Sequence, residues 1–199
     1  MNTIMSVING RTITSTETVI EKRYPATGEV IAEIQPATLA MLDEAVLHAK
    51  VAQTLWAAKA AHERARILNR IALCLAEHNE ELSRLEVRDV GKTYAEAVSA
   101  DVPSGAEAFE FFASLCATYH GTSHKWPDSI AYTQRVPLGV CAGIGAWNYP
   151  VQVACWKAAP ALAAGNAFIL KPSEETPLTA NTLADLFQQA GLPDGLFQV

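Results

Sequence analysis

Two short segments decide the fold of this chain: GIGAWNYP at residues 143–150 and NAFILKPSE at residues 166–174. Each has the pattern of a strand that ends in a polar turn and leads into a helix. In an open parallel sheet, turns of this kind present side chains and N–H groups to a ligand. The polar side chains here are an amide, an ammonium and a carboxylate, on Asn148, Lys171 and Glu174. Such a set suits a site that holds an oxyanion and a nucleotide ribose.

The sequence around these segments alternates between strands and helices. The predicted strands are 140–144, 167–170 and a third that begins at 195. Between them we predict a helix over 151–164, interrupted at Pro160, and a second helix capped by Thr176 and ended by Gly191. Alternating strands and helices with short turns imply a parallel sheet with right-handed crossovers. The predicted fold class is α/β, with the start of a Rossmann-like βαβαβ sheet.

Upstream of this sheet the pattern is mostly helical. Residues 1–36 read as short strands and turns, and helical periodicity then predicts four helices. The first begins after Thr38, and the second contains Leu68–Leu75. The third runs from Asn79 to a stop at Gly91, and the fourth spans Ser104–His120. Residues 121–136 alternate apolar and polar side chains, which predicts a hairpin that stands off the body. We therefore divide the chain into a part of strands and helices (1–120), an oligomerisation hairpin or arm (121–136) and a coenzyme sheet (137–199).

Composition and charge limit the partners. The chain has 199 residues, of which 50% are apolar and 18% charged, and its net charge of −6 argues against a nucleic-acid partner. The longest apolar run, 158–170, contains Pro160, Gly165 and Asn166, so we expect no membrane span. The N-terminus lacks the pattern of a signal peptide, which predicts a cytoplasmic protein. The four cysteines lack CxxC spacing, so we expect buried free thiols and no metal site.

The individual site residues allow more than one interpretation. Asn148 can donate to a developing oxyanion, or it can cap the helix that follows it. Lys171 and Glu174 can bind a ribose, or they can form an ion pair exposed to solvent. Trp156 is typical of packing, whereas Lys157 on the same apolar helix needs a partner or an exit to water. The glycines of residues 139–145 do not form GxGxxG, so the usual dinucleotide fingerprint is absent.

The run PLGVCAGIGAWNYPVQVACWKAAPALAAGNAFILKPSEETPLTA, residues 137–180, resembles the aldehyde dehydrogenase superfamily, most of all the betaine-aldehyde and aminoaldehyde dehydrogenases. The resemblance extends through residues 25–30, 91–92 and 132–135, and so covers nearly the whole chain. It implies oxidation of an aldehyde to a carboxylic acid with NAD or NADP, by a homo-oligomer (dimer or tetramer). In that family a cysteine thiolate attacks the carbonyl and a glutamate activates water.

The resemblance also implies roles for individual residues. Asn148 matches the amide that holds the oxyanion, and Lys157 resembles a lysine that moves protons away from the site. Tyr149 and Trp156 resemble two walls of an aromatic box for a trimethylammonium group. The residues that match coenzyme contacts are Ile144, Ala146 and Trp147 on the nicotinamide side and Lys171, Ser173 and Glu174 at the adenosine ribose. The run Lys22-Arg23-Tyr24, before the turn at Pro25, departs from the less basic residues common there, which counts against a cation site.

Family members are much longer than this chain, and their nucleophilic cysteine and general-base glutamate lie beyond its last residue. Cys141 and Cys155 do not match that cysteine, because they fall in a predicted strand and a predicted helix on the wrong side of Asn148. We therefore expect the N-terminal portion of an aldehyde dehydrogenase, truncated before the catalytic domain and inactive by itself. Two alternatives are a truncated, non-catalytic module for NAD binding or oligomerisation, and a dehydrogenase for ordinary aliphatic aldehydes.

Overall fold

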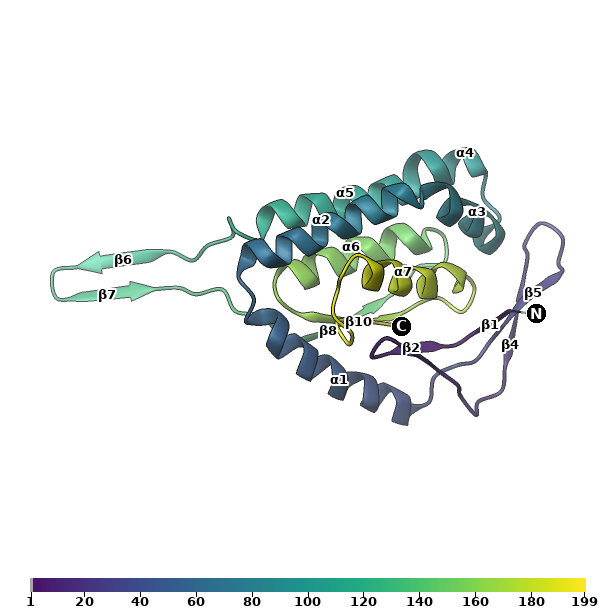
Figure 1. Cartoon of the computed structure of the whole chain (residues 1–199), viewed down its shortest axis with the longest axis horizontal. Helices are drawn as coiled ribbons and strands as arrows, with labels where there is room; N and C mark the ends of the chain where they lie inside the picture. The colour runs from purple at the N-terminus through teal and green to yellow at the C-terminus, as the bar shows by residue number, and fades with distance from the viewer. Residues whose placement is uncertain (1) are drawn as a thin grey trace.

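The computed structural model describes residues 2–199 and is built around the predicted parallel sheet (Figure 1). Strands β8 (Val140–Ile144), β9 (Ala167–Lys171) and β10 (Phe197–Gln198) lie in the order β10-β9-β8, and both pairs are parallel. Val140 pairs with Ala167 and Ile144 pairs with Lys171, so β8 and β9 end at the same edge. The predicted fold class is confirmed.

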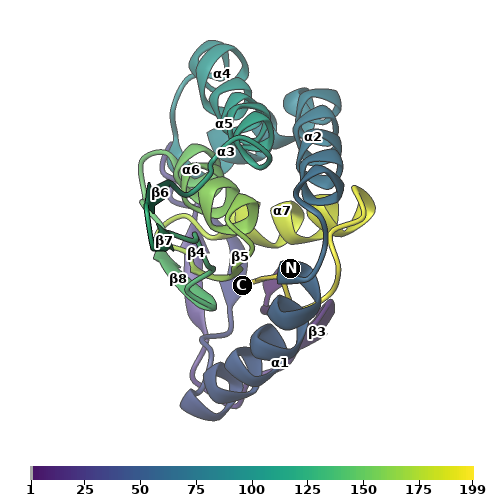
Figure 2. The same ribbon diagram turned by 90° about the vertical axis from the view of Figure 1, so that its left-hand side faces the viewer.

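Helices form layers on the two sides of this sheet (Figures 1 and 2). Helices α6 (Pro150–Ala163) and α7 (Leu178–Gln189) lie against one face, and α1 (Leu39–Ala57) lies against the other. Outside α6 pack α2 (Ala61–Glu77) and α5 (Val102–Leu115), with α3 (Asn79–Val90) beside α7. One apolar core joins these layers, because buried residues of 56–113 and of 151–197 belong to the same cluster.

The start of the first helix and the end of the third follow the predicted signals. The Thr38 hydroxyl accepts a hydrogen bond from the Met41 N–H and caps α1. Gly91 ends α3 with φ of 81°, a conformation that favours glycine. The prediction of helices after Thr38 and from Asn79 to Gly91 is confirmed.

The N-terminal strands contact the last strand of the sheet. β1 (Asn2–Ile4), β5 (Val30–Ile34) and β4 (Ile20–Arg23) form one small sheet, and β2 (Ser6–Ile8) pairs with β3 (Arg11–Ile13). Val7 in β2 exchanges two backbone hydrogen bonds with Val199, at 2.8 and 3.0 Å. The buried Gln198 side chain accepts from the Asn9 N–H and donates to the Ala45 carbonyl. The two ends of the chain are thus joined at the sheet.

The predicted helix over Ser104–His120 has the wrong bounds. Helical structure begins ten residues earlier, with α4 (Tyr94–Glu96) and a π-helical turn at Ala97–Asp101, and α5 ends at Leu115. Proline favours the first turn of a helix. In the structure Pro103 does lie in the first turn of α5, but the π turn precedes it, with the Val102 N–H bonded to the Ala97 carbonyl.

Two smaller predictions are also wrong. Pro160 does not interrupt α6, which runs continuously from Pro150 to Ala163. Because Pro160 has no N–H, the Trp156 carbonyl four residues earlier lacks its helical hydrogen bond. Trp156 is half exposed to solvent. Thr176 does not cap α7, because Asp89 on α3 accepts the hydrogen bond from the Leu178 N–H, at 2.8 Å.

The predicted hairpin is present and extends from the body (Figure 1). β6 (Ser123–Trp126) and β7 (Ser129–Tyr132) pair antiparallel, and every residue in them is exposed. At its base the Arg135 guanidinium lies 4.5 Å from the centre of the Tyr119 ring. Within residues 2–199, no helix has the length and apolar character needed to cross a bilayer.

Candidate coenzyme and aldehyde site

The two turns that follow β8 and β9 lie directly against each other. The Gly145 N–H donates to the Lys171 carbonyl at 2.8 Å. A Cβ atom at Gly145 would lie 3.0 Å from the Cα of Pro172, and one at Gly143 would lie 2.2 Å from the Phe168 ring. Glycine at these two positions therefore allows the strands and turns to approach closely. The turn that carries Asn148 and the turn that carries Lys171 and Glu174 therefore lie together at one edge of the sheet.

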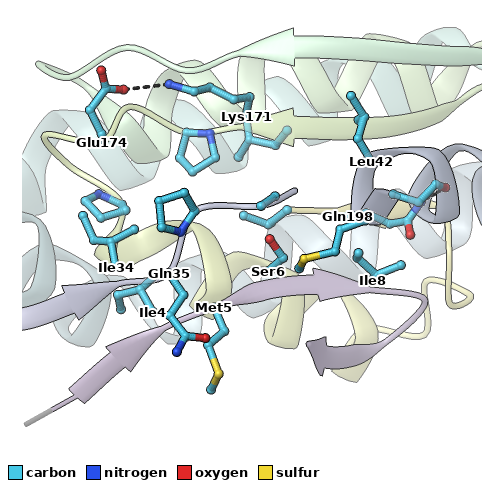
Figure 3. A pocket seen from close by; sticks show the side chains of 18 of the residues that line it. Ile4, Met5, Ser6, Ile8, Ile34, Gln35, Leu42, Lys171, Glu174 and Gln198 are labelled. Carbon is cyan, nitrogen blue, oxygen red and sulfur yellow. Dashed lines mark hydrogen bonds and ion pairs between the residues drawn. The ribbon is translucent and has the colours of Figure 1, made fainter. Parts of the chain in front are cut away.

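A cavity of about 500 Å³ opens beside the second turn (Figure 3). Lys171, Ser173 and Glu174 line one side of it. The other side is formed by residues of the N-terminal strands, of α1 and of β10, among them Ile4, Ile8, Ile34, Gln35, Leu42 and Gln198. This cavity is large and apolar enough to hold part of a nucleotide.

Lys171 and Glu174 form an ion pair at the mouth of this cavity. Lys171 Nζ lies 2.7 Å from Glu174 Oε2, and the two side chains are 60% and 59% exposed. The hydrogen bond from Lys171 holds the pKa of Glu174 below its ordinary value, so the carboxylate is charged at neutral pH. The structure confirms that Lys171 and Glu174 form an ion pair exposed to solvent. An exposed, charged carboxylate beside a cavity can still accept hydrogen bonds from sugar hydroxyls.

The turn that carries Ser173 and Glu174 is held from behind by a buried lysine. Lys22 Nζ donates to the Asp89 carbonyl at 2.6 Å and to the Glu175 carbonyl, and it lies 3.2 Å from the Asp89 carboxylate. The Lys22 and Asp89 side chains are 5% and 0% exposed. Burial raises the pKa of Asp89 to about 6, although the Lys22 charge opposes this shift. Lys22 was noted in the sequence as unusual, but nothing in the sequence indicated Asp89 as its partner.

The structure excludes one of the two interpretations of Asn148, that of a helix cap. The residue at the N-cap of α6 is Tyr149, and no side chain caps this helix. Asn148 is exposed, and across residues 2–199 no hydrogen bond of its side chain is recorded. The helix-cap interpretation is therefore wrong, which leaves the amide accessible in the turn.

Three other predicted coenzyme residues lie at the same edge. Ile144 ends β8, and Ala146 and Trp147 follow it in the turn. The Ile144 and Trp147 side chains are exposed, and Ala146 shares a small crevice with Ser173. Exposed apolar side chains of this size next to a strand end offer a contact surface for a ring. The structure thus brings all six predicted coenzyme residues to one edge of the sheet, although only the later three line the large cavity.

Tyr149 and Trp156 both form hydrogen bonds with the helical segment that runs from α4 into α5. The Tyr149 hydroxyl donates to Glu96 at 3.2 Å, and the Trp156 indole N–H donates to the Ser104 hydroxyl at 3.1 Å. Trp156 is 51% exposed, so the interpretation as a core-packing residue is wrong. Tyr149 is the N-cap of α6 and Trp156 lies within the helix, so both polar groups are tied to the segment that runs from α4 into α5.

Lys157 is exposed and reaches back to the sheet. Its Nζ donates to the Ile144 carbonyl at 2.5 Å. This contact supplies both the partner and the route to water that the sequence analysis required for a lysine on this helix. It also places an ammonium group beside the strand end that carries Asn148.

A buried group of charges beneath Tyr149 was missed in the sequence. Lys92 pairs with Asp101, and Glu86 lies buried close to both. Burial raises the pKa of Glu86 to about 8, and the Asp101 charge adds to this effect, while Lys92 opposes it. Glu86 is therefore mostly protonated at neutral pH. The helical pattern of 79–90 gave no signal for this, since Glu86 is one acidic residue among many on a polar helix.

None of the four cysteines in the structure has the features of an activated nucleophile. All four are free thiols, but only Cys155 is fully buried and the other three are half-buried. Burial raises the pKa of every one of them, and for Cys155 the nearby Glu86 adds to the effect. A raised pKa keeps a thiol protonated and unreactive at neutral pH.

Comparison with known proteins agrees with this geometry. Residues 12–199 match the model of the aldehyde dehydrogenase family. The chain is 54% identical over 194 residues to betaine aldehyde dehydrogenase of Rhizobium etli, which covers 96% of the chain and 40% of that relative. It is similar to the structure of PnpE in complex with nicotinamide adenine dinucleotide, with a TM-score of 0.95, 35% identity and coverage of 98% of the chain and 41% of PnpE.

An NADP-dependent enzyme of E. coli is similar as well, with a TM-score of 0.94, 33% identity and coverage of 98% of the chain and 41% of that structure. The chain belongs to the aldehyde dehydrogenase family. It spans about 40% of the length of the curated relatives that it matches.

Proposed function

We propose that this chain forms the coenzyme-binding part, and part of the substrate site, of an NAD(P)-dependent dehydrogenase that oxidises betaine aldehyde or a related aminoaldehyde. The observation that carries the proposal is the single edge where the amide turn of Asn148 meets the turn of Lys171 and Glu174. The similarity to betaine aldehyde dehydrogenases over 96% of the chain supports the same substrate class.

The coenzyme fits the residues at this edge. Lys171, Ser173 and Glu174 hold the adenosine ribose at the mouth of the cavity, and the charged Glu174 disfavours a 2′-phosphate. Ile144, Ala146 and Trp147 contact the nicotinamide side. The bound coenzyme supplies the acceptor for hydride. The complex of PnpE with nicotinamide adenine dinucleotide supports this role for the matching fold.

Asn148 stabilises the negative charge that develops on the aldehyde oxygen. A neutral amide donor needs no titration and is commonly worth ~3 kcal/mol in such a position. Lys157, held by the Ile144 carbonyl, releases an ammonium proton to water and is then reprotonated from the site, which moves one proton outward. Because Lys157 is exposed at one end and bound at the strand edge, it can connect the two.

Tyr149 and Trp156 recognise a quaternary ammonium group on the substrate. Tyr149 directly follows Asn148 in the chain, and both aromatic side chains bond to the segment that runs from α4 into α5. A desolvated cation over aromatic faces gains up to ~2 kcal/mol, whereas a neutral group gains only apolar contact. The thiolate and general base of the reaction belong to no residue that the structure describes, so the proposal concerns the complete gene product.

The test is turnover of the complete protein that contains this chain. Asn148→Ala should lower kcat for betaine aldehyde by roughly 10²–10³-fold. Turnover is measured from the absorbance of the reduced coenzyme. Asn148→Asp keeps the shape but removes the amide donor, so it should lose as much. Unchanged kcat in both variants would remove Asn148 from the reaction.

A second candidate function is self-association by a module without catalysis. The exposed hairpin β6–β7 favours it, because an unpaired strand edge can pair with another chain. We propose that this hairpin joins copies of the protein into a dimer or tetramer. Sequencing the gene downstream of Val199 separates the two candidates, since only the catalytic candidate requires a cysteine and a glutamate encoded there.

A further inference from the structure

The ring of Tyr149 lies on a buried ion pair. Lys92 Nζ is 3.8 Å from the centre of this ring, well within the range of a cation–π contact. The Lys92 side chain is 8% exposed, and it pairs with the fully buried carboxylate of Asp101. Because Asp101 balances its charge, Lys92 adds little net positive potential to the space around the ring.

A second contact fixes the other end of the same ring. The Tyr149 hydroxyl donates to Glu96 Oε1 at 3.2 Å. One ring is therefore held on its face by Lys92 and at its hydroxyl by Glu96. Two contacts at different points leave the ring little freedom to rotate about its side-chain bonds.

The two carboxylates involved, Glu96 at the hydroxyl and Asp101 as the partner of Lys92, lie at the two ends of the π-helical turn. Glu96 precedes this turn and Asp101 ends it, and the Val102 N–H bonds to the Ala97 carbonyl five residues before it. In a regular α-helix, residues five apart differ by roughly 140° around the axis, so one of the two would point away. The wider π turn moves them toward the same side, and such turns are frequent at functional sites.

We infer that Lys92, Glu96 and Asp101 are positioning residues that hold the Tyr149 ring in place and thereby set the selectivity for a cationic over a neutral aldehyde. The inference rests on the proposed function, which makes Tyr149 a wall of the substrate site. A quaternary ammonium group gains from an aromatic face only when that face is correctly directed. With one face covered by Lys92, the opposite face is the one left for the substrate.

The experiment compares two aldehydes of the same shape in the complete protein. Betaine aldehyde carries a trimethylammonium group, and 3,3-dimethylbutanal carries a neutral carbon in place of the nitrogen. The double variant Lys92→Met/Asp101→Asn removes the ion pair without changing net charge. It should lower the ratio of kcat/KM for the cationic to the neutral aldehyde by about threefold to tenfold. Glu96→Ala, at an exposed residue, should lower the same ratio by about twofold to threefold.

Arg84→Met is the matched control. Arg84 forms another cation–π contact, 5.2 Å from the centre of the Tyr94 ring, but it is exposed and does not touch Tyr149. Its removal should leave the ratio unchanged. If the double variant does not fold, Glu96→Ala decides, because it changes only an exposed side chain.

Tyr149→Leu separates failure of this inference from failure of the proposed function. A fall in kcat/KM that is equal for both aldehydes in Tyr149→Leu would defeat the proposed aromatic wall, and this inference with it. A selective fall in Tyr149→Leu, combined with an unchanged ratio in folded Lys92→Met/Asp101→Asn and in Glu96→Ala, would overturn the positioning role alone.

Discussion

Lys22→Met should destabilise the protein and loosen the turn of the coenzyme site. The substitution keeps an apolar side chain of similar length but removes the ammonium that joins β4, the end of α3 and the Glu175 carbonyl. Breaking a buried ion pair by removing one partner typically costs about 3–5 kcal/mol, because the other charge stays buried. Asp89 is fully buried and its pKa is already raised to about 6, so it should take up a proton when Lys22 is absent. We therefore expect the lower end, about 3 kcal/mol.

Urea unfolding at neutral pH, followed by tryptophan fluorescence, measures this loss. The double variant Lys22→Met/Asp89→Asn removes both charges and keeps an oxygen that can accept from the Leu178 N–H. It should recover most of the stability, since replacement of a whole buried pair is often nearly neutral. Hydrogen exchange at Ser173–Thr176 should rise in Lys22→Met but less in the double variant. A loss under about 0.5 kcal/mol in Lys22→Met would show that Lys22 contributes no more than an exposed ion pair does.

Three further predictions concern coenzyme choice, assembly and pH. Glu174→Gln in the complete protein should weaken NAD binding and reduce the rejection of NADP, measured by titration with each coenzyme; unchanged affinities for both would place the ribose elsewhere. Ala131→Pro should lower the oligomeric state in sedimentation and leave coenzyme binding intact, and an unchanged sedimentation coefficient would indicate a hairpin without partners. The pKa of Glu86 is raised in the fold to about 8, so the folded state binds more protons than the unfolded chain between its ordinary pKa and about 8, and stability should fall as pH rises through this window by up to about 1.4 kcal/mol per unit. Glu86→Gln should flatten that slope in urea unfolding at a series of pH values, and an undiminished slope would assign the effect to other groups.

Features set by local sequence could be predicted well. The cap at Thr38, the stop at Gly91 and the alternation of strands and helices after Leu138 depend on neighbouring residues, and the structure confirms them. The exposed hairpin follows from alternation over a few residues. These signals are local, so a single sequence contains them.

Features set by distant contacts could not be predicted. Asp89 caps α7 from a position 89 residues earlier, and it replaces the cap that Thr176 was expected to provide. The π-helical turn at Ala97–Asp101 has no sequence signature of its own, and it ends at Asp101, the buried partner of Lys92. Trp156 was misjudged because helical periodicity shows which residues share a face but not what covers that face. The site residues came from the resemblance, and their roles are still proposals.

The proposed aromatic wall for a cationic aldehyde is tested by Trp156→Leu in the complete protein. Steady-state kcat/KM is measured for betaine aldehyde and for 3,3-dimethylbutanal, with thermal unfolding as a check on the fold. The protein should favour betaine aldehyde by up to about thirtyfold, which corresponds to ~2 kcal/mol of cation–π attraction. Trp156 is half exposed, so its loss should remove most of that preference with little loss of thermal stability. Equal falls for both aldehydes, or no initial preference, would contradict the account.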